Sequence, residues 1–156
     1  FKLEINSFDN ELVAAAPSLC HSDHILGIYV SIVGVCTRVG ILGVKSGIAC
    51  TSPSLILFLK NMGIVEFFPY ILGSDSTSKH KPDPEPVLQT LREFGVDASE
   101  AIMVGDMPVD IAMAHNAGVK AVGVSYGNAT REELIAAKAD WIIDNISELI
   151  DIIAHN

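Results

Sequence analysis

The stretch that decides the fold is AIMVGDMPVDIAMAHNAG, residues 101–118. Residues 101–104 are uniformly apolar, which predicts a buried strand. After it, Pro108 suits the first turn of a helix. Apolar residues then recur at three- and four-residue spacing as far as Gly118, which predicts an amphipathic helix. A buried strand followed directly by a helix is typical of a parallel sheet covered by helices.

The same alternation of short apolar runs and helical patterns extends from about residue 46 to the end of the chain. Thr130 and Glu133 also form a capping-box pattern at the start of one helix. We predict a single three-layer α/β, Rossmann-like domain over residues 1–156, with a parallel sheet. The apolar runs lie at 48–50, 70–72, 101–104, 119–124 and 141–143, and the helical patterns at 12–19, 35–44, 55–62, 84–94, 109–117, 130–135 and 146–153.

The composition narrows the classes of function. Hydrophobic residues make up 49% and charged residues 19% of the chain, which is a globular composition, and the net charge is -9. Nucleic-acid binders need clustered Lys and Arg, so we expect no nucleic-acid partner. The three cysteines lack CxxC spacing and predict free thiols in a reducing cytosol.

The most apolar run, residues 25–35, is too short for a membrane span and predicts a buried core element. Left uncovered, it would favour a homo-oligomer. Lys2, Glu4 and Asp9 stand where a signal peptide would need apolar residues. We therefore expect a cytoplasmic protein with no membrane partner.

Two acidic residues follow the strand at 101–104. Asp106 lies at its carboxyl end, where open parallel sheets bind ligands, and Asp110 follows four residues later. Clustered carboxylates suit Mg²⁺, which prefers oxygen ligands. The alternative is that Asp106 caps the helix and Asp110 is a solvated acid of its first turn.

A second segment, KHKPDPEP at residues 79–86, has prolines at alternate positions that fix an extended entry into the next helix. A lysine held there could neutralise a phosphate or a neighbouring carboxylate. Together, KHKPDPEPVLQTLREFGV, AIMVGDMPVDIAMAHNAGVKAVGVSYG and ADWIIDNISELIDII resemble the haloacid dehalogenase superfamily, and within it the phosphoglycolate phosphatase-like branch. The resemblance covers roughly residues 63–153.

The resemblance implies a phosphatase mechanism. Asp9 would attack the substrate phosphorus and form an aspartyl-phosphate, with Glu11 in the position of the acid/base. Lys81 would steady the nucleophile and the developing charge. Asp106 and Asp110, together with Asp9, would hold Mg²⁺.

The upstream text GVCTRVGILGVKSGIACTSP is similar to the segment that leads to the family's hydroxyl motif. Thr51 would then hold a phosphoryl oxygen of a small phosphorylated metabolite, or Ser52 would if the register slips. The family's cap domain, which closes the site and chooses the substrate, is here reduced to a remnant at about residues 18–33.

The first motif departs from the family pattern. The family has an Asp-x-Asp-x-Thr loop, whereas this chain reads FDNELVAAAP at residues 8–17 and lacks the Gly-Thr turn. The first hypothesis is a Mg²⁺-dependent phosphatase. The alternative is a catalytically inactive relative that binds metal, phosphate or a partner, with Asp9 an ordinary surface acid. An altered or truncated chain would also explain the loss of both motif and cap.

Overall fold

A computed structural model describes most of the carboxyl-terminal two thirds of the chain. It gives the backbone of two strands, at 33–38 and 44–49, and then residues 55–155 except for 62, 64, 66, 67 and 74. The sequence predictions for 12–19 and 25–32 lie outside these residues.

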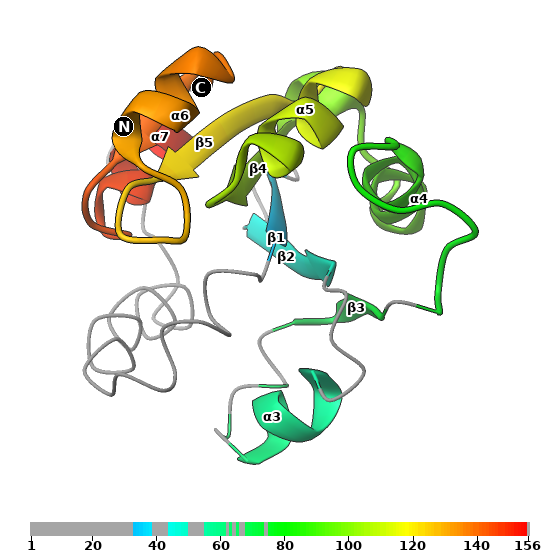
Figure 1. The fold of residues 1–156 in the computed structure, drawn as a ribbon. Helices are drawn as coiled ribbons and strands as arrows, with labels where there is room; N and C mark the ends of the chain where they lie inside the picture. Colours follow the sequence, from blue (N-terminus) through cyan, green and yellow to red (C-terminus); the bar gives the residue numbers. More distant parts are fainter. Residues whose placement is uncertain are drawn as a thin grey trace.

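The described strands form one six-stranded sheet with the order β3-β2-β1-β4-β5-β6 (Figure 1). Three pairs are parallel, namely β2 with β3, β4 with β5, and β5 with β6. The strands are β1 (Val33–Arg38), β2 (Val44–Ala49), β3 (Tyr70–Leu72), β4 (Ala101–Gly105), β5 (Lys120–Val124) and β6 (Trp141–Ile143).

Strand β1 departs from the prediction in two ways. It runs antiparallel to both neighbours, β2 and β4, so the sheet is mixed. The prediction of a helix at 35–44 is also wrong, since β1 and β2 occupy both ends of that stretch. The segment VGVCTR is rich in β-branched residues, which suit strands, and the glycines that follow it disfavour a helix.

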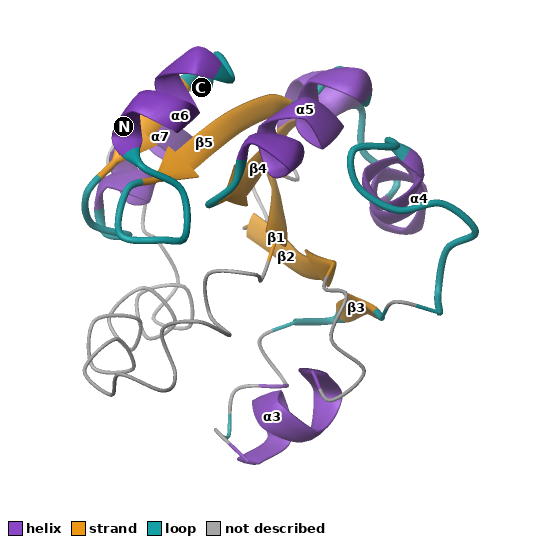
Figure 2. Cartoon of the chain, in the orientation of Figure 1, coloured by secondary structure: helices purple, strands orange, loops and turns teal. Residues whose placement is uncertain are grey.

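Helices cover both faces of the sheet, as Figure 2 shows in purple against the orange strands. Alternate residues of β4 enter two clusters: Met103 packs with Ile111 of α5 and Leu134 of α6, whereas Ile102 packs with Leu149 of α7. This arrangement confirms the three-layer α/β class. The helices are α3 (Leu55–Asn61), α4 (Glu85–Phe94), α5 (Pro108–Asn116), α6 (Arg131–Ala136) and α7 (Glu148–His155), with the 3-10 turn η3 (Ala98–Glu100) before β4.

Two local predictions from the sequence are confirmed, namely the end of a helix at Gly95 and the capping box of Thr130 and Glu133. Gly95 ends α4 in the left-handed conformation, with φ of 65°, which an L side chain rarely adopts. The Thr130 hydroxyl accepts a hydrogen bond from the Glu133 N–H at 3.2 Å, and the Glu133 carboxylate accepts one from the Thr130 N–H at 2.8 Å. None of the helices in the described ranges has the length and apolar character needed to cross a membrane.

Candidate active site

The turn between β4 and α5 builds the centre of the site. Gly105 ends β4, Met107 is the N-cap of α5 in extended conformation, and Asp106 lies between them at the carboxyl end of the strand. The Asp106 side chain is 0% exposed and Asp110 only 1%. The alternative reading of these acids is therefore wrong, because Asp106 is not the N-cap and Asp110 is not solvated.

Asp110 connects the turn to a lysine from a distant loop. Its Oδ2 accepts hydrogen bonds from the N–H groups of Asp106, at 3.2 Å, and Met107, at 3.1 Å. Its Oδ1 lies 2.8 Å from Nζ of Lys81. The two side chains of this ion pair are only 2% and 16% exposed, so they meet away from bulk water. Oδ2 thus accepts two hydrogen bonds, whereas Oδ1 has the ion pair with Lys81 but no hydrogen bond from the described residues.

Asp106 is held from the other side by the loop after β5. Its Oδ2 accepts two hydrogen bonds from Asn128, one from the backbone N–H at 2.9 Å and one from the side-chain Nδ2 at 2.8 Å. Its backbone carbonyl accepts a third bond, from the Ala129 N–H at 3.1 Å. Within the described part of the chain, nothing hydrogen-bonds to the buried Oδ1.

Burial raises the pKa of the Asp106 carboxyl above its ordinary value, and the negative charge of Asp110 adds to this rise. The Asn128 hydrogen bonds and the Lys81 charge act in the opposite direction. The net effect is a buried carboxylate that is costly to keep charged without a nearby cation.

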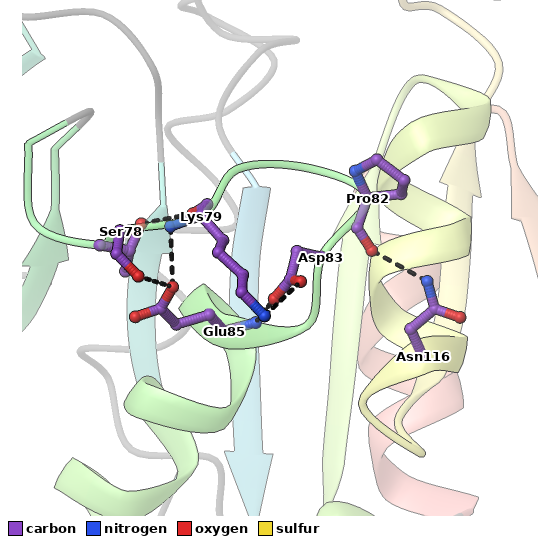
Figure 3. Close-up of polar contacts among 7 residues, drawn as sticks. Ser78, Lys79, Pro82, Asp83, Glu85 and Asn116 are labelled. Atoms are coloured by element: carbon purple, nitrogen blue, oxygen red, sulfur yellow. Dashed lines mark hydrogen bonds and ion pairs between the residues drawn. The ribbon is translucent and has the colours of Figure 1, made fainter.

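The loop that carries Lys81 is braced at both ends (Figure 3). The Glu85 Oε2 accepts hydrogen bonds from the Ser78 hydroxyl at 2.9 Å and the Lys79 N–H at 2.8 Å. The Asn116 Nδ2, at the end of α5, donates to the Pro82 carbonyl at 2.9 Å. Because α5 also carries Asp110, the loop and its lysine are fixed to the same helix as their partner.

The donor set fits a hard divalent cation such as Mg²⁺. The bare Asp106 Oδ1 is a carboxylate oxygen at a buried position, and a metal ion would satisfy it. Over the described residues, however, no three His, Cys, Asp or Glu side chains lie close enough together to hold an ion. Mg²⁺ commonly uses one or two protein carboxylates and keeps several waters, so two carboxylates are compatible with it.

The backbone at Gly105 lies so close to the Asp110 side chain that there is no room for a Cβ atom at position 105. A Cβ built there would lie 2.3 Å from the Asp110 Cβ and 2.9 Å from its Cγ. We expect Gly105→Ala to lower the free energy of unfolding by about 3 kcal/mol, because either the strand or α5 must move. Denaturant unfolding measures this loss.

The matched control for this change is Gly123→Ala in the neighbouring strand. Gly123 is the register partner of Gly105, and its Cβ would meet the buried Leu134 side chain at 3.2 Å from one methyl and 3.4 Å from the Cβ, contacts that a shift of a few tenths of an ångström relieves. That variant should lose less than about 1 kcal/mol. Equal losses in the two variants would contradict the role given to Gly105.

The chain matches a known family of hydrolases. The model of the haloacid dehalogenase-like hydrolase family matches residues 20–124. The chain belongs to this family. The predicted resemblance to the superfamily and to its phosphoglycolate phosphatase-like branch is confirmed.

Several of the similar proteins are phosphatases by name. The pyrophosphatase PpaX of Bacillus velezensis is 38% identical over 70% of this chain and 52% of its own length. A phosphoglycolate phosphatase of Vibrio parahaemolyticus is 36% identical over 62% of this chain and 42% of its own. A crystal structure described as that of a predicted phosphoglycolate phosphatase from Haemophilus somnus matches with a TM-score of 0.61 at 31% identity, covering 67% of this chain and 48% of that one. The chain thus spans about half the length of the curated relatives that it matches.

The structure brings together Lys81, Asp106 and Asp110 of the residues proposed from the sequence. Four others, Asp9, Glu11, Thr51 and Ser52, lie outside the described residues, as does most of the cap remnant at 18–33, and their roles stay predictions. Sequence reasoning missed three residues that shape the site: Gly105, Asn116 and Asn128.

Proposed function

We propose that this chain carries the phosphate-handling core of a Mg²⁺-dependent phosphatase of small phosphorylated metabolites, such as phosphoglycolate-like monoesters. The observation that carries the proposal is the buried cluster of Lys81, Asp106 and Asp110 at the carboxyl edge of the sheet, in which the Asp106 Oδ1 receives no hydrogen bond from the described residues. Ligands of open α/β sheets bind at this edge. The names of the similar proteins support a phosphatase.

In this proposal each of the chain's site residues has its own role in the reaction. Asp9 would attack the phosphorus, the bond to the leaving-group oxygen would break, and Glu11 would protonate that oxygen. The Thr51 hydroxyl, or that of Ser52, would hold a phosphoryl oxygen. Water would then hydrolyse the aspartyl-phosphate and regenerate Asp9.

Lys81 would place a positive charge beside the reacting phosphate while Asp110 fixes the direction of its side chain. Asp106, with Asp9 and Asp110, would hold the metal. A bound Mg²⁺ neutralises negative charge on phosphoryl oxygens, the main requirement of phosphoryl transfer.

The second candidate function is a catalytically inactive module that binds metal, phosphate or a partner. The altered first motif, FDNELVAAAP, favours it, because the loss of the Gly-Thr turn redirects the chain after Asp9. This candidate keeps the cluster of Lys81, Asp106 and Asp110 but predicts no turnover.

A hydrolysis assay separates the two candidates. Release of phenol from an aryl phosphate is measured with wild type and Asp9→Asn, with and without Mg²⁺. The phosphatase proposal expects Mg²⁺-dependent turnover that falls by at least about 1,000-fold in the variant, because a catalytic nucleophile is removed. Equal rates would remove Asp9 from the mechanism. Mg²⁺ binding without turnover would leave the inactive module as the function.

A further inference from the structure

The two oxygens of the Asp106 carboxylate have unequal surroundings. An ionised carboxylate oxygen has about two lone-pair positions. On Oδ2 both are taken by Asn128, through its backbone N–H and its Nδ2. On Oδ1 the described residues supply no hydrogen bond. The Asp106 Oδ1 is therefore available to bind a cation, whereas Oδ2 is occupied by its hydrogen bonds to Asn128.

The loop that makes this distinction also has contacts that do not involve the Asp106 carboxylate. At its start, the Ser125 N–H donates to the Ile143 carbonyl at 3.0 Å, and the Ser125 hydroxyl donates to Asp144. At its end, Arg131 pairs with the same Asp144 at 2.7 Å. The loop therefore presents Asn128 to Asp106 from two ends that are each held by contacts with the segment after β6.

We infer that Asn128 is a positioning residue that sets the choice of metal ion, by occupying Oδ2 so that Asp106 binds through Oδ1 alone. Ca²⁺ takes six to eight oxygen ligands and accepts a carboxylate through both oxygens, whereas Mg²⁺ demands octahedral geometry with few protein ligands. A carboxylate restricted to one oxygen thus disfavours Ca²⁺ more than Mg²⁺. This inference rests on the proposed function, since it assumes the metal site.

The test is calorimetric titration of the whole chain with MgCl₂ and with CaCl₂, in the absence of phosphate ester. Asn128→Ala frees one lone pair of Oδ2, and Asn128→Leu roughly keeps the shape of the side chain while removing its donor without adding a charge. The Asn128 side chain is exposed, so both variants should fold, and thermal unfolding verifies this. The control is Asn145→Ala, which removes a hydrogen-bond acceptor at the start of α7 away from Asp106.

Wild type should bind Mg²⁺ more tightly than Ca²⁺. In both Asn128 variants Mg²⁺ should bind about tenfold more weakly, the usual effect of losing a residue that orients a ligand. Ca²⁺ should bind as well as before or better, so the preference for Mg²⁺ falls about tenfold or more. Asn145→Ala should leave the preference unchanged.

Two results would overturn the inference. The first would leave the proposed metal site intact, whereas the second would also refute that site. If both ions weaken by the same factor in the Asn128 variants, Asn128 is merely structural and the metal site remains. If wild type binds neither ion, the metal site of the proposed function fails, and the inference fails with it.

Discussion

Replacing Lys81 with methionine should both destabilise the protein and remove hydrolysis. The ammonium group lies 2.8 Å from the Asp110 Oδ1, and both side chains are largely buried. Removing one partner of a buried ion pair typically costs 3–5 kcal/mol, because the other charge stays buried without compensation. Asp110 keeps two backbone N–H bonds on Oδ2, so we expect a loss of about 3 kcal/mol in the free energy of unfolding.

Catalysis should suffer further, since Lys81 would supply positive charge beside the reacting phosphate. Loss of one such group costs about 10²–10³-fold in kcat. Denaturant unfolding and the aryl phosphate assay measure the two effects separately.

Lys79→Met is the matched control for this variant. It is the same chemical change two residues away, at an ion pair with Asp83 that is exposed on the lysine side, where the side chain is 66% exposed (Figure 3). Pairs of this kind contribute at most about 1 kcal/mol, so the control should remain near wild type in both measurements. If Lys81→Met behaves like Lys79→Met, the Lys81 ammonium group is not a part of the site.

The part of the site that can be predicted from the sequence consists of residues that are close together in the chain. Asp106 and Asp110 follow one strand within a single turn of chain, so their position at the carboxyl end of β4 follows from the strand and helix patterns alone. Lys81 was found through the family resemblance, because its ion pair with Asp110 joins segments that local patterns do not connect. The sequence also gave no sign that this ion pair would be buried.

Contacts between distant segments were not predictable. Asn128 meets Asp106 only because β4 and β5 are neighbours, and one of its two donors is a backbone N–H, which every residue but proline has. Asn116 meets Pro82 across 34 positions in the same way. β1 was missed as a strand, because its stretch was interpreted as part of a helix, and its direction could not have followed from the sequence either, since a short strand has the same side-chain pattern whichever way it runs.

Asp106→Asn should abolish metal binding while making the metal-free protein more stable. The bare Oδ1 is the oxygen that the described residues offer to a cation, and a neutral amide is a poor replacement for it. Loss of an outer residue alone weakens metal sites by roughly 10–100-fold, so loss of the carboxylate itself should exceed about 100-fold. Calorimetric titration with MgCl₂ measures this loss, and hydrolysis should disappear with it.

The gain in stability follows from the burial of Asp106. With a side chain that is 0% exposed, the charged form pays a desolvation cost that the amide avoids, and the amide oxygen can still accept the Asn128 hydrogen bonds. Without metal, the variant should unfold at a higher denaturant concentration than wild type. Adding Mg²⁺ should raise the midpoint of wild type but not that of Asp106→Asn, since an ion stabilises the fold it binds. Asp151→Asn, the same change at an exposed site on α7, should respond to Mg²⁺ as wild type does. A variant at position 106 that still gains stability from Mg²⁺ would place the ion elsewhere, and the burial of Asp106 would then need another cause.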